Sequence, residues 1–141
     1  MLAHQKLKVY GKALAVVTSL TMHSVQWKKR HSVVDQLCRA SESVVLNLAE
    51  AVRVRQNAHQ QQLLDYAVGS GLECAACVDI AVIKGFLISE LASAEKRSLC
   101  EVVRMLIGLR SELEAEQREP GMDPLSRVVL MLRSLSESFL G

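Results

Sequence analysis

The most constraining feature of this sequence is a strict recurrence of apolar and small residues at intervals of three and four. It occurs within residues 33–55 and again within residues 99–113. Such spacing holds one stripe of a helix against a neighbour, which is the seam of a left-handed helical bundle. The first series is Val34, Leu37, Ser41, Val44, Leu48 and Ala51, and the second is Leu99, Val102, Leu106, Leu109 and Leu113.

Residues that break helices are scarce. Only two prolines and seven glycines occur in 141 residues, which favours helix over a turn-rich β fold. Hydrophobic residues make up 50% of the chain but aromatic residues only 4%, so the core must be aliphatic. We predict an all-α fold: an up-down-up-down antiparallel four-helix bundle over residues 1–118, then a turn and a short C-terminal amphipathic helix over 119–141.

Capping residues and periodicity set the expected helix boundaries. Ser32 and Asn57 are candidate N-caps, and Gly85 is expected to end the third helix in the left-handed conformation. The expected helices span about residues 4–24, 33–55 and 58–84, and a fourth begins at Ser89 or Ser93 and frays into the charged run from Glu112 to Glu119.

The first and third helices carry features that bear on their packing. In the first, one stripe is expected to be buried, with a second stripe beside it. The third helix contains Gly69 and Gly71, and a glycine inside a helix costs about 1 kcal/mol relative to alanine. We therefore expect a close approach by another element there. The stripe expected to be buried is Leu7, Tyr10, Leu14, Val17 and Thr21, and its neighbour is Val9, Ala13, Val16 and Leu20.

The C-terminal segment is expected to begin at a turn, with Asp123 as N-cap and Pro124 at the first helical position. Its apolar face either docks a partner helix or packs on its own bundle, and packing on the bundle is favoured. That face comprises Leu125, Val128, Val129, Leu132, Leu135 and Phe139.

Charge is distributed unevenly along the chain. Nine Lys and Arg against three Asp and Glu give residues 1–55 a net charge of +6, whereas eight against twelve give the remainder −4. This asymmetry suits a polyanion on one surface, although ordinary solvated helix faces have the same composition. Trp27 beside three cations adds a possible base-stacking residue, or a tryptophan that caps the bundle end. The candidate nucleic-acid contacts are Lys28, Lys29, Arg30, Arg53 and Arg55, with Lys6, Lys8 and Lys12 as weaker candidates.

No enzyme, cofactor or metal site is expected. Cys74 and Cys77 have the spacing of a zinc-ligand pair but no second pair or spaced histidines, so core packing is the better interpretation. Glycine-rich phosphate loops and nucleophile motifs are lacking. The apolar stretch 71–88 contains three charged residues, too many for a membrane span. These features and the cysteines inside helical patterns favour the cytoplasm.

Two blocks resemble a known family. Residues 36–51 are similar to the pattern Q-L-x-R-A-x-x-S-I-x-x-N-I-A-E-G, and residues 67–73 to A-x-G-S-x-x-E. These patterns mark the four-helix-bundle family named for the ribosomal-RNA intervening-sequence protein, and the resemblance extends over about residues 5–113. The sequence of residues 43–50 and 72–77 resembles the branch of accessory variability determinants of diversity-generating retroelements more closely than the ribosomal branch. The family glycine is replaced here by Ala51.

The resemblance implies a homopentameric, positively charged barrel that binds a reverse transcriptase and nucleic acid, either the template RNA or DNA. No association with a membrane is expected. The alternatives are a ribosome-associated or orphan bundle of the same family, and a protein-interaction scaffold without nucleic acid. The resemblance also suggests that polar residues of the second and third helices form an interhelical network that sets their register. That expected network comprises Arg39, Ser43, Asn47, Glu50, Ser70 and Glu73.

Overall fold

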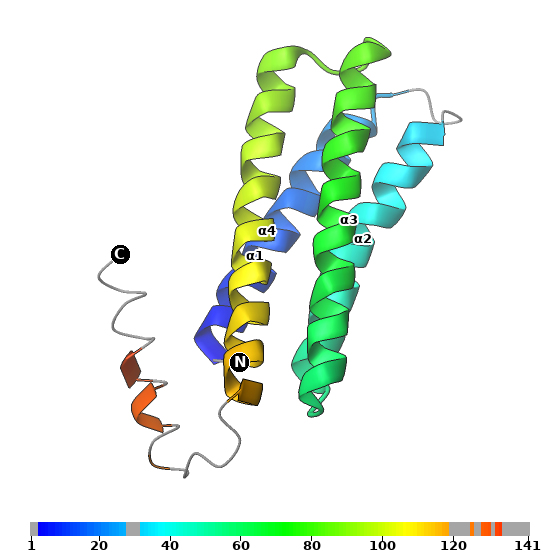
Figure 1. The fold of residues 1–141 in the computed structure, drawn as a ribbon. Helices are drawn as coiled ribbons and strands as arrows, with labels where there is room; N and C mark the ends of the chain where they lie inside the picture. Colours follow the sequence, from blue (N-terminus) through cyan, green and yellow to red (C-terminus); the bar gives the residue numbers. More distant parts are fainter. Residues whose placement is uncertain (1–2, 28–31, 119–124, 126–127, 131, 134–141) are drawn as a thin grey trace.

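Four long helices form the protein (Figure 1). The computed structural model describes residues 3–27, 32–118, 125, 128–130 and 132–133. Successive helices run in opposite directions, so the predicted all-α, antiparallel four-helix bundle is confirmed. The helices are α1 (Ala3–Ser24), α2 (Ser32–Arg53), α3 (Asn57–Ile83) and α4 (Ser89–Arg118).

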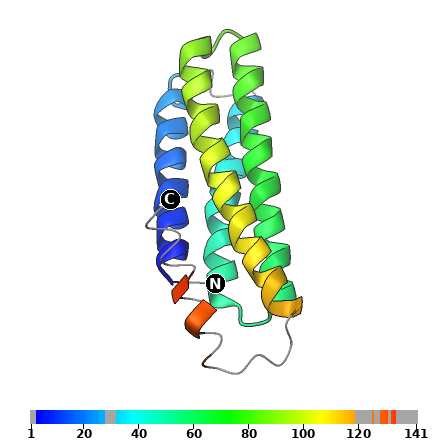
Figure 2. The ribbon, with the colours of Figure 1, turned by 60° about the vertical axis from the view of Figure 1, so that its left-hand side comes forward.

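The helix α3 makes the most extensive contacts in the bundle. It packs against α2 on one side and α4 on the other, and α1 closes the bundle against the same two helices (Figure 2). By length and composition α3 could also cross a membrane, with a mean hydropathy of 1.5 over its most apolar window. The core helix of a soluble bundle meets the same criterion, and α3 buries one stripe between its neighbours.

Both predicted seams lie in the core. Of the α2 series, Val34 is half-buried and the other five residues are at most 5% exposed. The α4 series is at most 3% exposed throughout. The α4 helix continues through the charged run to Arg118, so the predicted fraying after Glu112 was wrong within the described residues.

The expected orientation of α1 was wrong. Leu7 is 72% exposed, and Tyr10 and Leu14 are also exposed, whereas the neighbouring stripe of Val9, Ala13, Val16 and Leu20 is buried. Polar contacts with α4 explain this rotation, because they recur every seven residues on the side of α1 that faces α4. The side chains of Gln5, Lys12 and Ser19 contact Glu112, Glu101 and Glu95, respectively.

The two ends of α3 differ from one another in how they are capped. Asn57 is not the N-cap: it is the first helical residue, and its Nδ2 donates to the carbonyl of Leu113 at 3.1 Å, which ties α3 to α4. At the other end Gly85 has a φ of +76°, as predicted. The Gly85 amide donates to Val82 and the Phe86 amide to Ala81, which completes a Schellman motif.

The two helical glycines of α3 have different roles. A Cβ added to Gly71 would lie 2.8 Å from Val103 Cγ2, so the expected close approach is confirmed there, against α4. Gly69 faces outward with nothing within 4 Å, so the same expectation was wrong for it within one subunit. The two residues are 200° apart around the helix, and therefore only one can face α4.

The described residues of the C-terminal segment are helical at 125, 128–130 and 132–133. Leu125 is 72% exposed and Leu132 is 59% exposed, and Val128 and Val129 are each 48% exposed. The expectation that this apolar face packs on the bundle was therefore wrong for these residues. Asp123, Pro124, Leu135 and Phe139 lie outside the described residues.

Gly71→Ala should have a free energy of unfolding about 1–3 kcal/mol below that of a matched Gly→Ala control, because overpacking forces the stiff Val103 side chain to shift. Gly108→Ala is the matched control, since Gly108 lies in α4 with nothing within 4 Å. That control should gain about 0.5–1 kcal/mol from helix propensity. Urea denaturation measures both values, and a Gly71→Ala protein as stable as the control would contradict the packing described.

Candidate nucleic-acid interface

The candidate cations occupy separate parts of the bundle. Arg53 and Arg55 lie where α2 gives way to α3; the Arg53 side chain is 76% exposed, and Arg55 is exposed too. Because α2 has 22 residues and spans about 33 Å, this end lies far from Trp27 at the other end. Lys28, Lys29 and Arg30 lie outside the described residues.

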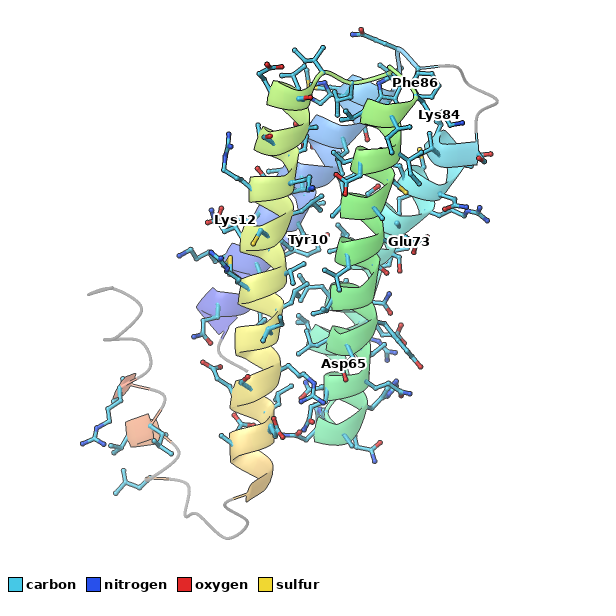
Figure 3. All side chains as sticks on the ribbon, turned by 45° about the horizontal axis from the view of Figure 1, so that its top comes forward. Tyr10, Lys12, Asp65, Glu73, Lys84 and Phe86 are labelled. Atoms are coloured by element: carbon cyan, nitrogen blue, oxygen red, sulfur yellow. The ribbon has the colours of Figure 1, made fainter. Side chains whose placement is uncertain are left out.

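The lysines of α1 differ in how far they are neutralised. Lys8 is exposed and Lys6 half-buried, whereas Lys12 Nζ lies 2.5 Å from Glu101 Oε1 on α4. The hydrogen bond and the charge of Lys12 lower the pKa of Glu101. Lys12 is therefore a poor candidate for a phosphate contact, because it already has an anionic partner. Figure 3 shows Lys12 on α1, with Asp65 and Glu73 along α3.

Several cations of α3 and α4 are paired with carboxylates. Arg110 Nε lies 2.6 Å from Asp65 Oδ1 and its Nη1 3.4 Å from Glu114 Oε2, and the hydrogen bond with Asp65 raises the pKa of Arg110. Lys96 Nζ lies 2.8 Å from Asp79 Oδ1. These pairs hold two cations of the second half, whose net charge is −4, whereas residues 1–55 have a net charge of +6.

Three of the six expected network residues are brought together. Asn47 Nδ2 donates to the Ser43 carbonyl and to Ser43 Oγ, each at 2.9 Å, and Ser70 Oγ donates to Ser43 Oγ at 2.8 Å. The last bond joins α3 to α2. Arg39, Glu50 and Glu73 are exposed and lie outside this set. Glu50 instead lies 3.7 Å from Arg53.

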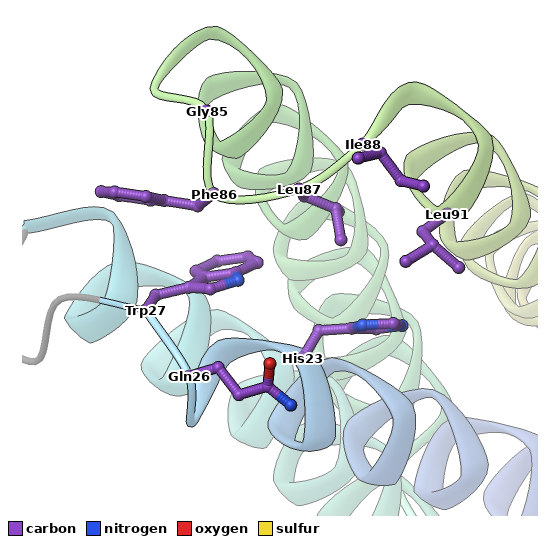
Figure 4. Close-up of a pocket in the computed structure, with 8 residues that line it drawn as sticks. All are labelled: His23, Gln26, Trp27, Gly85, Phe86, Leu87, Ile88 and Leu91. Atoms are coloured by element: carbon purple, nitrogen blue, oxygen red, sulfur yellow. The ribbon is translucent and has the colours of Figure 1, made fainter.

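Trp27 closes one end of the bundle. Its ring stacks on Phe86 with centroids 5.9 Å apart, and it is 6% exposed. Trp27 is therefore a cap of the bundle end, as one of its two interpretations predicted. A hollow of about 420 Å³ opens beside it, between the end of α1 and the α3–α4 link (Figure 4).

A buried carboxylate lies behind this hollow and was missed by sequence reasoning. Glu95 is 4% exposed; its Oε1 accepts a hydrogen bond from Ser19 and lies 3.2 Å from His23 Nε2. Glu95 Oε2 is buried without a partner among the described residues. Leaving such an atom unsatisfied costs about 1–3 kcal/mol. The signal was present, because extending the α4 seam back four residues from Leu99 reaches Glu95.

This cluster is not arranged for nucleophilic catalysis. A serine nucleophile needs its hydroxyl on a base that a third group orients. Here the carboxylate stands between Ser19 and His23, so the histidine does not contact the hydroxyl in the required order. Within the described residues, no group of three or more His, Cys, Asp or Glu side chains could hold a metal ion.

The four cysteines fall into two pairs. Cys74 and Cys77 are buried in the core, as predicted, whereas Cys38 and Cys100 are exposed. Burial raises the pKa of Cys74 from 9.0 to about 12, with the Cys77 and Glu73 charges adding to the shift. Burial also raises the pKa of Cys77. Both core thiols are thus protonated and unreactive near neutral pH.

These features define a small helical bundle with a basic N-terminal half. A model of the family described as the 23S rRNA-intervening sequence protein matches residues 5–108, and the protein belongs to this family. That match confirms the family resemblance but does not address the accessory branch.

One solved relative has the same fold. It is a protein with unknown function from the S23 ribosomal protein family of Bacteroides thetaiotaomicron VPI-5482, with a crystal structure at 1.70 Å resolution. Its TM-score is 0.71 at 17% sequence identity, and the match covers 76% of this chain and 98% of that chain. At this identity the likeness shows the shared fold alone. No curated protein matches the chain.

The raised pKa of Cys74 predicts a pH-dependent stability. Because the unfolded thiol titrates near 9.0 and the folded thiol near 12, the stability that it contributes is present below pH 9 and lost as pH rises. Between pH 8 and 10 we expect Cys74 to lower the free energy of unfolding by about 1 kcal/mol. Urea denaturation should show that the free energy of unfolding of Cys74→Ala falls less between pH 8 and 10 than that of the wild type. The exposed control, Cys38→Ala, should lose as much as the wild type. Equal losses in all three proteins would refute this prediction.

Proposed function

We propose that this protein is a non-enzymatic, cytoplasmic accessory protein that binds RNA as a homo-oligomer and assists the reverse transcriptase of a diversity-generating retroelement. The observation that carries RNA binding is the segregation of charge. Residues 1–55 have a net charge of +6 and expose Lys8 and Arg55, whereas the rest of the chain has −4 and carboxylates hold its Lys96 and Arg110. A surface with uncompensated cations attracts a polyanion and releases its counterions.

Self-association is supported by the outer face of α3. A helix that is apolar all round is normally buried, yet one subunit leaves an apolar strip of α3 uncovered. Leu72 is 59% exposed and Ile83 81% exposed, and Ile80 lies between them at 39%. Gly69 and Ala76 are exposed on the same side and leave room for close approach by another helix. A second copy of this chain is the occupant that we propose, with five copies implied by the resemblance.

Repetition of the subunit would strengthen RNA binding. Each subunit presents only a few cations, and single phosphate contacts are weak at physiological salt. Several copies around one axis repeat those cations, and the second contact to one RNA then becomes intramolecular. This avidity is consistent with a modest net charge of +2 per chain.

Association with ribosomal RNA is the second candidate function, because the family description refers to the 23S rRNA-intervening sequence. The two functions share the basic surface and differ in the RNA and protein partner. Crosslinking the tagged protein to RNA in its native cells and sequencing that RNA separates them. Template RNA, with a co-purifying reverse transcriptase, supports the first function, and 23S rRNA supports the second.

Reversal of the candidate cations should weaken RNA binding and its salt dependence. The slope of log affinity against log salt is about −0.7 for each phosphate neutralised on single-stranded RNA. Arg53→Glu with Arg55→Glu should therefore flatten the slope by about 1.4, and reversal of Lys28, Lys29 and Arg30 should flatten it further. Arg97→Glu with Arg104→Glu, on exposed positions of α4, is the control of equal charge change. An equal loss of RNA affinity in this control, or RNA binding that does not depend on salt, would contradict the proposed surface.

Leu72→Glu should break the assembly without unfolding the subunit. A buried, unpaired carboxylate at a subunit interface costs several kcal/mol, whereas the same residue is solvated in a monomer. Light scattering should then give a mass near the 15.6 kDa of one chain, with unchanged helical circular dichroism. Met22→Glu is the control, because Met22 is 67% exposed on α1, which packs against α2 and α4 rather than α3. A wild-type mass of one chain would refute self-association.

A further inference from the structure

The hollow beside Trp27 has walls of two kinds. One side consists of the aliphatic side chains of Leu87, Ile88 and Leu91, from the α3–α4 link and the start of α4. The other side consists of the Trp27 indole and the His23 imidazole, from the end of α1 and the turn after it (Figure 4). A volume of about 420 Å³ lies in the range of small-molecule sites. Such walls suit a flat ring.

Polar groups also face this hollow. The indole nitrogen of Trp27 points toward it (Figure 4), and the indole N–H has no acceptor among the described residues. Gln26 is exposed at its rim and offers an amide donor and acceptor. His23 directs Nε2 to Glu95 Oε1 at 3.2 Å, which fixes the orientation of its ring beside the hollow. The hollow therefore presents donors and acceptors beside its apolar walls.

The buried Glu95 limits the charge of any ligand. Its carboxylate lies behind His23, is 4% exposed and has one oxygen without a partner among the described residues. A phosphate or carboxylate placed in the hollow would be repelled by it. A neutral ring with hydrogen-bonding groups on its edge would not.

We propose that this hollow binds one nucleobase. A nucleobase is flat and neutral, and its edge carries the donors and acceptors that Trp27, Gln26 and His23 complement. Proteins that recognise single-stranded RNA bind unstacked bases in this manner, against aromatic side chains and by their edges. For a base within RNA this inference rests on the proposed function; a free nucleotide would satisfy the same chemistry.

The fluorescence of Trp27 offers a direct test, because it is the single tryptophan of the sequence. The full-length protein is titrated with a short labelled oligoadenylate, with an abasic strand of the same length, and with AMP and UMP. Anisotropy of the labelled strands reports binding, and tryptophan quenching reports a base in the hollow. We expect both strands to bind and only the strand with bases to quench.

Two variants connect the quenching to the hollow. Gln26→Ala removes a rim amide, and Leu91→Phe fills part of the space, so each should weaken base-dependent quenching at least about fivefold. Neither should change the affinity for the abasic strand. Ile107→Phe is the matched control on α4, where an exposed aliphatic side chain is likewise enlarged. Thermal melting by circular dichroism verifies that each variant is folded.

Each outcome decides the inference. Quenching by oligoadenylate that the two variants weaken supports a base of bound RNA. Quenching by AMP or UMP without binding of either strand supports a site for free nucleotides and refutes RNA binding. Binding of both strands with no quenching by any probe overturns the inference and leaves RNA binding intact. No binding and no quenching by any probe overturns both.

Discussion

The bundle depends on the close contact between α3 and α4 at Gly71. The absence of a side chain there lets Val103 approach the α3 backbone, so the two helices lie nearer than larger residues would permit. Asn57 joins the same two helices at one end by a hydrogen bond to the Leu113 carbonyl. With α3 held this way, a second side of it meets α2 through the Ser70–Ser43 hydrogen bond, and a third side remains uncovered.

That arrangement links core packing to the outer surface. Because α3 has more apolar residues than two neighbours can cover, its strip around Leu72, Ile80 and Ile83 remains exposed in one subunit. Charge is also divided unevenly along the chain, with +6 over residues 1–55 and −4 over the rest, where carboxylates hold Arg110 and Lys96. An apolar strip for assembly and a basic half for a polyanion can therefore coexist on one small protein.

The closed end of the bundle combines stability with a potential for recognition. The Trp27–Phe86 stack covers the core, and the Schellman motif at Gly85 turns the chain so that Phe86 reaches Trp27. Glu95 is held by Ser19 and His23 just behind this cap. A buried carboxylate with an unpartnered oxygen is unfavourable for folding alone. Because Glu95 contacts His23, which lines the open hollow, this buried carboxylate is consistent with a role in binding at this end.

The sequence by itself determined the helices, both seams, the αL turn at Gly85 and the burial of Cys74 and Cys77, because these follow from local periodicity and backbone preference. It also carried the blocks that define the family. Only the tertiary structure decided which stripe of α1 is buried. Two adjacent apolar stripes have similar periodicity, and the choice between them came from contacts of Gln5, Lys12 and Ser19 with α4. The roles of Gly69 and Gly71 and the Glu95 cluster were likewise set by which residues of distant helices meet, and spacing within one helix does not contain that information.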